Sequence, residues 1–434
     1  MTAQPDSTAP ELLRFNTCGS VDDGKSTLIG RLLYDSKSLM EDQVADLEHS
    51  ADLTGGGQVN LANLTDGLRA EREQGITIDV AYRYFATPRR RFILADTPGH
   101  RQYTRNMVTG ASTAQLSIVL VDARHGLTEQ TRRHMGIAAL LRVPHLVVAV
   151  NKMDLVDWSA ARFAELQAEF AALPAHLGLA GATFIPLSAL LGDNVVTRSP
   201  HTPWHGGPPL LEHLETVAVP APAGPEDPFR LPVQWVNRPH LPTHPQLRDF
   251  RGVSGRLAGG RVRPGQEIQV LPGGQRSTVR EIWTGDGPVA EADAPQSVTL
   301  VLADDLDIGR GDLLVSPGSA PRSSAEPAAD LCWLHPTPLA VGKKYWLKHH
   351  ARTQPVIVSS LTGRLEPATF TTEPAPAALA MNDLGRVTLR TAQPVHYDDY
   401  ARNRTLGGFI LIDPATHATV AAGMFDGDGA GRPD

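Results

Sequence analysis

The chain has 434 residues, with 40 basic and 47 acidic side chains and a formal net charge of −7. Hydrophobic residues make up 41% and charged residues 20%, a balance that is typical of folded soluble proteins and excludes wholesale disorder. The acidic balance argues against a chain built mainly to coat nucleic acid. Two cysteines are too few for a disulfide framework or a four-thiolate zinc site. With no signal-peptide pattern at the start and no apolar run long enough to cross a membrane, we expect a cytoplasmic protein.

The first half of the chain alternates strand-like and helix-like segments. We expect strands at residues 14–17, 91–95, 116–121 and 146–150, and helices at 25–33, 128–141 and 160–173. Strands that alternate with helices predict a mostly parallel sheet with crossover helices on both faces. This half therefore has the pattern of an α/β fold.

The second half begins after a proline-rich segment at residues 219–228, which is typical of a linker. Short strand-like segments broken by Gly and Pro follow, and their spacing predicts small antiparallel β-barrels. These segments are residues 230–236, 252–257, 267–271, 278–283 and 297–302, and then 339–350, 354–361, 385–389 and 408–412. A low-complexity segment at 318–329 separates the two groups. We predict an α/β domain at residues 1–222 and two β-barrel domains at 228–318 and 328–427.

A glycine-rich turn after the first strand matches the pattern G-x-x-x-x-G-K-[ST]. It reads GSVDDGKS and opens a helix, which is the context that a phosphate-binding loop requires. Backbone N–H groups and the helix N-terminus would bind phosphate oxygens. Lys25 would reach the β and γ phosphates, and Ser26 would bind Mg²⁺. The residues predicted to line this loop are Gly19, Ser20, Val21, Asp22, Asp23, Gly24, Lys25, Ser26 and Thr27.

Three further motifs follow later strands. The sequence DTPG, from Asp96 through Thr97 and Pro98 to Gly99, offers a carboxylate to Mg²⁺ and an N–H group to a γ-phosphate. The sequence NKMD offers an Asp that can accept two hydrogen bonds from guanine, a pairing that adenine lacks. The third motif, SAL, from Ser188 through Ala189 to Leu190, can add a backbone N–H to the guanine carbonyl. The residues predicted to contact the base are Asn151, Lys152, Met153, Asp154, Ser188, Ala189 and Leu190. All four motifs in this order predict GTP with Mg²⁺ as the bound cofactors.

Two further residues are candidates for the hydrolysis step. Thr77 is a candidate second Mg²⁺ hydroxyl in a loop that would order around a γ-phosphate, although residues 76–78 also fit an ordinary edge strand. His100 follows DTPG directly, where an imidazole could orient the attacking water. The predicted catalytic residues are His100, Thr77, Lys25 and Gly99, and the predicted metal ligands are Ser26, Thr77 and Asp96.

These motifs, read as longer segments, resemble the GTPase large subunit of bacterial sulfate adenylyltransferase, within the translation-factor GTPases. The resemblance rests on GSVDDGKSTLIGRLL, DGLRAEREQGITIDVAYRYF, ADTPGH, QYTRNM and NKMDLVD, and in the second half on PVQWVNRP, FRGVSGRLAGGRV, VTLVL, IGRGDLL and GGFILID. It implies Val21 and Ile76 as an apolar pair beside His100. Two departures are Arg101, where Glu is usual in this family, and an insertion at residues 240–247.

The resemblance also implies a function and a partner. Members of this family use GTP hydrolysis to drive formation of adenosine 5′-phosphosulfate and diphosphate from ATP and sulfate. The adenylyl transfer takes place on a separate small subunit, which binds ATP and sulfate, so we expect a heterodimer or a larger assembly. Two alternatives remain open: a translation factor that delivers aminoacyl-tRNA, and a regulatory GTPase without a coupled reaction. Steeply salt-dependent RNA binding would favour the first.

Overall fold

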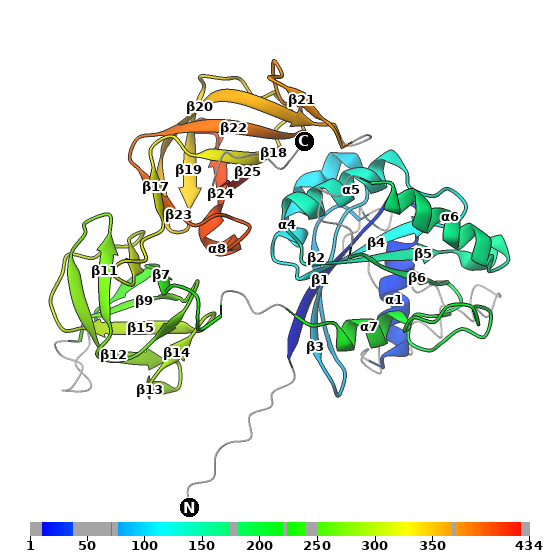
Figure 1. The fold of residues 1–434 in the computed structure, drawn as a ribbon, viewed down its shortest axis with the longest axis horizontal. Coiled ribbons are helices and arrows are strands. Elements are labelled where there is room, and N and C mark those ends of the chain that lie inside the picture. Colours follow the sequence, from blue (N-terminus) through cyan, green and yellow to red (C-terminus); the bar gives the residue numbers. More distant parts are fainter. Residues whose placement is uncertain are drawn as a thin grey trace, which may run out of the picture. The chain divides into compact units, whose positions relative to one another are not determined.

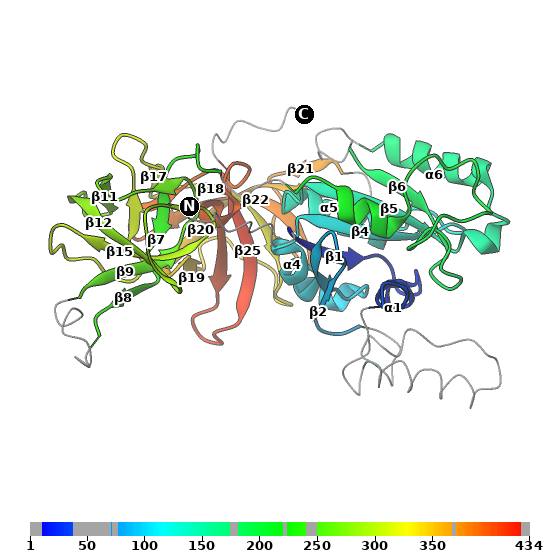
Figure 2. The ribbon, with the colours of Figure 1, turned by 90° about the horizontal axis from the view of Figure 1, so that it is seen from below.

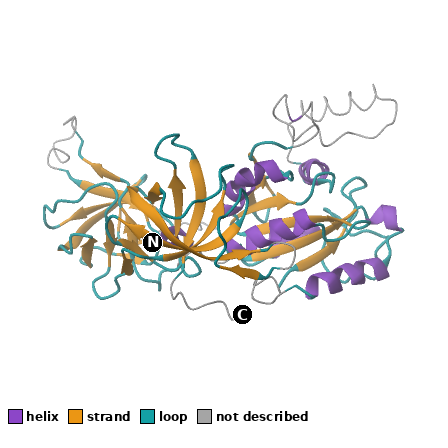
Figure 3. Ribbon diagram, turned by 90° about the horizontal axis from the view of Figure 1, so that it is seen from above, coloured by secondary structure: helices purple, strands orange, loops and turns teal. Residues whose placement is uncertain are grey.

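The computed structural model describes residues 11–37, 71, 77–173, 181–219, 224–239, 250–366 and 370–426. By its internal contacts the chain forms two compact units. Unit 1 contains residues 1–220 and 366–371, and unit 2 contains residues 221–365 and 372–434. Helices gather in unit 1, whereas strands dominate unit 2 (Figure 3). No helix in the described part of the chain is long and apolar enough to cross a bilayer.

Unit 1 is built on a six-stranded sheet with the order β2-β3-β1-β4-β5-β6. All neighbours pair in parallel except β2 and β3, which form an antiparallel edge. Its strands are β1 (Leu12–Cys18), β2 (Ala81–Ala86), β3 (Arg91–Asp96), β4 (Leu116–Asp122), β5 (His145–Asn151) and β6 (Thr183–Pro186). Every residue of β4 is buried, which explains its uninterrupted apolar run, because helices cover a parallel sheet on both faces.

Helices cover the two faces of this sheet in two groups (Figures 1 and 2). The first group packs its leucines into one core with β1, β3 and β4, and consists of α1 (Lys25–Asp35) and α7 (Leu210–Thr216). The second group is α4 (Thr104–Ser112), α5 (Glu129–Leu140) and α6 (Ala160–Ala171). The 3₁₀ turn η2 (Arg101–Tyr103) directly precedes α4, and η3 (Met153–Val156) lies between β5 and α6. The side chain of Thr128 caps α5 by accepting the Thr131 N–H, and the side chain of Ser159 caps α6 by accepting the Arg162 N–H. These two caps fix where the helices begin.

The first barrel of unit 2 has the strand order β7-β16-β11-β12-β15-β9-β8. Backbone bonds from Ala258 to Arg230 and from Gln234 to Ser254 join its two ends. Its strands are β7 (Arg230–Pro232), β8 (Trp235–Asn237), β9 (Gly252–Arg256), β10 (Arg261–Val262), β11 (Glu267–Leu271), β12 (Arg276–Thr284), β13 (Gly287–Val289), β14 (Ala292–Asp293), β15 (Ser297–Leu302) and β16 (Leu313–Val315).

The second barrel of unit 2 is closed, because β19 pairs with β20 and completes a ring of six strands. Its elements are β17 (Arg322–Ser324), β18 (Ala328–Trp333), β19 (Lys344–His349), β20 (Arg352–Leu365), β21 (Thr372–Pro374), β22 (Leu384–Thr391), β23 (Val395–Tyr397), α8 (Arg404–Gly407), β24 (Gly408–Ile412) and β25 (Thr419–Phe425). A mostly parallel α/β unit followed by two antiparallel barrels confirms the predicted fold class.

Candidate functional site

The phosphate-binding loop connects the end of β1 to the first turn of α1. Gly24 caps α1 in the left-handed region, with φ of 92°. A Cβ atom at this position would lie 2.4 Å from Asn151 Nδ2, so both the backbone and the space require glycine. The backbone N–H of Ser20 donates to Asp23 Oδ2 at 2.6 Å and keeps the loop curled. The local sequence therefore builds the cradle that the motif predicts.

Lys25 lies inside this cradle. Its Nζ donates to the carbonyl oxygens of Gly19 at 3.1 Å and Ser20 at 2.7 Å. Burial lowers the pKa of Lys25, while the nearby carboxylates of Asp23 and Asp96 oppose that shift. The DTPG turn lies against the same atoms, since a Cβ on Gly99 would lie 2.3 Å from Lys25 Nζ. The structure thus brings together two motifs that are far apart in the sequence.

The DTPG turn is anchored to β1 on its other side. Asp96 is buried at the end of β3 and accepts a bond from Thr17 Oγ1 at 3.5 Å. Thr97 Oγ1 donates to the Thr17 carbonyl at 2.5 Å. His100 is half-buried, and its Nδ1 accepts the backbone N–H of Gln102 at 3.2 Å. With Nδ1 occupied as an acceptor, the neutral imidazole carries its proton on Nε2, which is the nitrogen left to face a water.

The segment around Thr77 is tied to the helix that follows the DTPG turn. Thr77 is buried. Asn106 Nδ2 on α4 donates to the Ile78 carbonyl at 2.7 Å. Residues 77–80 form no strand, and the edge strand β2 begins only at Ala81. Val21 is 37% exposed, and its suggested neighbour Ile76 lies outside the described residues. The two departures from the family pattern also lie outside them, namely the insertion at 240–247 and the side chain of Arg101.

The NKMD and 188–190 segments converge at the far end of the phosphate loop. Asn151 Nδ2 donates to the Asp23 carbonyl at 2.7 Å, and its Oδ1 accepts the Ala189 N–H at 2.9 Å. Asn151 therefore clamps the two loops together. Lys152 Nζ lies 2.9 Å from Asp122 Oδ2 and also bonds the Asp22 carbonyl. Met153 and Ser188 are fully buried beneath this surface.

Asp154 is the residue that points to a base. Its Oδ1 is buried and has no hydrogen-bond partner among the described residues. An unpaired buried carboxylate oxygen costs free energy, so such an atom needs a ligand donor to become satisfied. The N1–H and 2-amino groups of guanine are donors of this kind. The residues present therefore fit a guanine nucleotide.

Helix α5 contributes a set of supporting residues that the sequence reasoning missed. His134 is fully buried, and its Nδ1 accepts the Gly19 N–H at 3.1 Å. Its Nε2 lies 2.9 Å from Gln130 Nε2, which also donates to the Gly99 carbonyl at 3.1 Å. Thr128 Oγ1 lies 2.7 Å from Ser20 Oγ. One helix thus holds both the phosphate loop and the DTPG turn.

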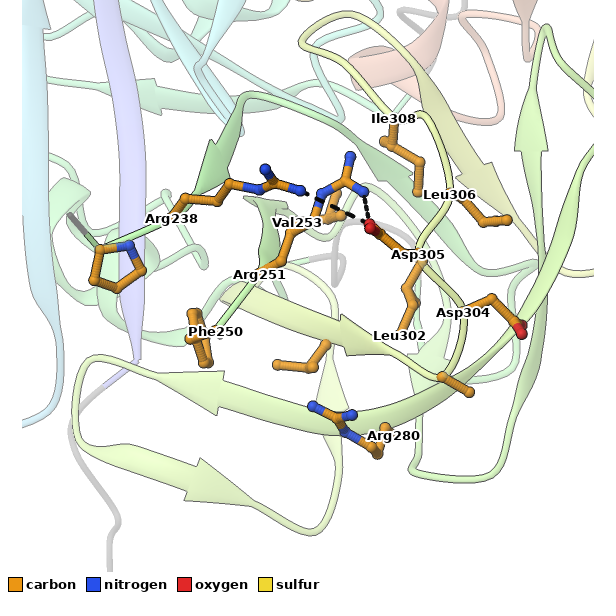
Figure 4. Close-up of a pocket in the computed structure, with 13 residues that line it drawn as sticks. Arg238, Phe250, Arg251, Val253, Arg280, Leu302, Asp304, Asp305, Leu306 and Ile308 are labelled. Atoms are coloured by element: carbon orange, nitrogen blue, oxygen red, sulfur yellow. Dashed lines mark hydrogen bonds and ion pairs between the residues drawn. The ribbon is translucent and has the colours of Figure 1, made fainter. Parts of the chain in front are cut away.

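A separate hollow lies in the first barrel and contains none of the predicted site residues. Its volume is about 520 Å³, and its lining includes Arg238, Phe250, Arg251 and Asp305 (Figure 4). Arg251 forms an ion pair with Asp305, and Arg238 lies 3.8 Å from the same carboxylate. The charges of this hollow are therefore largely balanced within the barrel.

Comparisons with known proteins show the family to which the chain belongs. Residues 10–220 match the family described as Elongation factor Tu GTP binding domain, and residues 326–426 match the family described as GTP-eEF1A C-terminal domain-like. A Mycobacterium tuberculosis protein named Bifunctional enzyme CysN/CysC is 54% identical over 414 residues, which cover 95% of this chain and 67% of that protein. A Teredinibacter turnerae protein named Sulfate adenylyltransferase subunit 1 is 50% identical over 416 residues, which cover 95% of this chain and 87% of that protein. The chain belongs to the sulfate adenylyltransferase subunit 1 family.

Among solved structures, that of sup35 complexed with GMPPNP is similar with a TM-score of 0.44 and 23% identity, covering 97% of this chain and 95% of that one.

The glycine at the start of α1 gives the first test of this site in the subunit 1 chain. Gly24→Ala places a side chain in the left-handed region and against Asn151, so we expect the unfolding free energy to fall by about 1–3 kcal/mol. We also expect the Kd for GTP to rise at least tenfold. Gly206→Ala is the matched control, because nothing lies within 4 Å of a Cβ there. Equal behaviour of the two variants in calorimetry would contradict the assigned cradle.

The buried histidine of α5 gives a pH-dependent test in the same subunit. Burial, with Lys25 and Arg133 nearby, lowers the pKa of His134 to about 3. The unfolded chain therefore binds a proton at His134 that the folded chain excludes, so this stability is present above about pH 6.5 and is lost as pH falls toward 3. The slope from this group is at most about 1.4 kcal/mol per pH unit.

His134→Asn keeps an acceptor near the Gly19 N–H but cannot titrate. We expect its unfolding free energy, measured in urea between pH 7 and 4, to fall less steeply than that of the wild-type chain. Because other histidines contribute equally to both curves, the difference between the curves isolates His134. Parallel curves would mean that His134 is not held neutral against the phosphate loop.

Proposed function

We propose that this chain is the GTP-hydrolysing subunit of a sulfate adenylyltransferase. It couples GTP hydrolysis to the formation of adenosine 5′-phosphosulfate and diphosphate from ATP and sulfate on a separate small subunit. The observation that carries the GTP assignment is the buried, unpartnered Asp154 Oδ1 beside an assembled phosphate cradle. Membership of the subunit 1 family supports the coupled reaction and the three-domain arrangement of residues 1–222, 228–318 and 328–427.

The residues fall into distinct roles in this proposal. Lys25 and the backbone around Gly99 neutralise charge on the γ-phosphate as the bond to the bridging oxygen breaks. His100 orients the attacking water through Nε2, and the water's proton leaves with the phosphate product. Asp154 with the 188–190 loop selects guanine. Lys25 donates to two loop carbonyls in the structure, bonds that phosphate oxygens would replace.

Mg²⁺ would be held by Ser26, Thr77 and Asp96 together with phosphate oxygens. Hydroxyl and carboxylate oxygens are hard ligands of the kind that Mg²⁺ prefers. When bound, the ion supplies charge neutralisation across the β and γ phosphates. Asp96 is buried, and its carboxylate is close enough to Lys25 to oppose the lowering of that lysine's pKa by burial. A cation beside Asp96 would therefore meet a carboxylate that the protein holds in place, not one that water surrounds.

The coupled reaction has a direct test in product formation. A phosphosulfate anhydride is a high-energy product, so adenylylation of sulfate runs uphill unless another reaction drives it. We expect the chain with its small subunit to accumulate adenosine 5′-phosphosulfate well beyond the uncoupled equilibrium with GTP, and not with a non-hydrolysable GTP analogue. Equal accumulation with both nucleotides would mean that GTP hydrolysis does not drive the adenylylation.

A further inference from the structure

The outer face of the second barrel carries a patch of residues from four neighbouring strands, β24, β19, β20 and β22. Along β19, burial alternates, so that Tyr345 and Leu347 enter the barrel core while Lys344, Trp346 and Lys348 face outward. Pairing with β20 places Ile357 opposite Lys344 and Pro355 opposite Trp346. Strands β20 and β24 lie on either side of β19 (Figure 1).

The remaining pairs complete the patch, which we call the Lys–Trp face. Ile412 and Ile410 of β24 lie opposite Trp346 and Lys348, Thr353 lies opposite Lys348, and Arg390 of β22 lies opposite Ile357. Directly opposed residues on one sheet face have Cβ atoms about 4.5–5.5 Å apart, so these side chains form one surface. The residues of the Lys–Trp face are Lys344, Trp346, Lys348, Thr353, Pro355, Ile357, Arg390, Ile410 and Ile412.

The face has an apolar centre and a basic rim. Trp346 is 37% exposed, and Pro355 is exposed beside it. Three of the nine residues are cations and none is acidic, in a chain whose net charge is −7. Lys344, Lys348 and Arg390 form no ion pair with any residue that the structure describes. The positive charge of this face is therefore left for something outside the barrel.

Lysine usage singles out the same strand. The chain contains 34 arginines but only six lysines. Lys25 and Lys152 belong to the nucleotide site, and three of the remaining four lie at positions 343, 344 and 348. The lysine ammonium group is compact and strongly hydrated, so it is well placed at the solvent-exposed edge of an interface, where its charge attracts an oppositely charged partner. Lys343, the residue before Lys344, is not part of the face, because its Nζ lies 2.9 Å from Asp413 Oδ2 in an ion pair.

We propose that the Lys–Trp face is the docking surface for the small, adenylyl-transferring subunit, whose matching surface is acidic around an apolar groove. This inference rests on the proposed function. Lys344 and Lys348 flank Trp346 along β19, and Pro355 and Ile412 lie opposite it. An aromatic residue in an apolar centre with charge at the edge is the arrangement of a protein interface. Nucleic acid fits less well, because three isoleucines and a proline occupy the places where stacking aromatics or further cations would lie.

The test measures heteromer formation by isothermal titration of the full-length chain with its small subunit. We expect Trp346→Ser, and separately the double variant Lys344→Glu with Lys348→Glu, to raise the Kd at least tenfold. Lys344→Arg with Lys348→Arg should keep the wild-type Kd. Matched controls in the first barrel are Trp235→Ser, at a tryptophan that is 64% exposed, and Arg256→Glu with Arg310→Glu. The second control makes the same charge changes at exposed arginines that form no ion pair with any described residue. Circular dichroism melting checks that each variant folds.

Each outcome decides the proposal. A wild-type Kd in both face variants overturns it. If those variants change GTP turnover of the isolated chain and leave the Kd unchanged, unit 1 of the same chain covers the face and the proposal fails. RNA binding that the charge reversal removes, again with an unchanged Kd, overturns it in favour of nucleic acid. A wild-type chain that does not bind the small subunit at all refutes the proposed function, and the docking surface falls with it. A wild-type complex with coupled turnover leaves the function standing and lets the variants alone decide the face.

Discussion

His100→Ala is expected to lower stimulated GTP hydrolysis by two to four orders of magnitude while leaving the Kd for GTP within about twofold. A positioned imidazole contributes on the order of 10²–10⁴ to a proton-transfer or water-orienting step. Among the described residues, the side chain of His100 bonds the Gln102 backbone N–H and contacts the ring of Tyr103, and no hydrogen bond joins it to the base-pocket residues. The variant therefore loses water orientation and retains the cradle.

Single-turnover hydrolysis and nucleotide binding are measured on the same preparations. His125→Ala is the control, because its side chain is 65% exposed and lies in the same unit. If His100→Ala hydrolyses GTP within about threefold of wild type, another group orients the water. A parallel loss of GTP binding would instead show that His100 supports the DTPG turn.

Asp154→Asn is expected to raise the Kd for GTP at least a hundredfold. In the wild-type chain the buried, unpartnered Asp154 Oδ1 would accept hydrogen bonds from guanine. In the variant an amide NH₂ group replaces a carboxylate oxygen, and a donor then faces the donors of guanine. Xanthine carries a carbonyl where guanine carries the 2-amino group. The variant should therefore gain affinity for xanthosine triphosphate.

Competition titrations with both nucleotides measure this exchange of preference. Asp157→Asn is the control, since Asp157 is an exposed neighbour on the same turn. An unchanged preference for GTP in Asp154→Asn would place the base elsewhere. Loss of both nucleotides would indicate that the variant disrupts the turn rather than its selectivity.

Local sequence patterns were enough to predict many elements of the fold. The bounds of β11, β15 and β24 are those predicted. Pro272 directly follows β11 and Asp413 directly follows β24, whereas Asp304 lies two residues beyond the end of β15. The predicted strand at 230–236 is instead two strands, β7 and β8. The chain changes partner there, since Val233 donates to Asp312 and Gln234 to Ser254. The predicted strand at 339–350 begins only at Lys344, after a turn in which Gly342 has φ of 87°.

Helix α4 and strand β2 were not predicted as elements. The α4 sequence TRNMVTGAS contains glycine and β-branched residues of low helix propensity, and contacts with β1 and β3 favour the helix. The site shows the same division. Glycine and lysine positions of the phosphate loop follow from a local motif. The support from His134 could not be predicted, because the residue lies 115 positions from Gly19 and resembles any buried helical histidine.

GTP hydrolysis by the chain in complex with its small subunit, measured with and without ATP plus sulfate, decides whether the two reactions are coupled. We expect slow turnover with GTP alone, and strong stimulation only when both ATP and sulfate are present. Phosphate released from GTP should then rise together with adenosine 5′-phosphosulfate. Turnover that is indifferent to ATP and sulfate in an intact complex would contradict the coupling and leave a GTPase of the same fold with a different task.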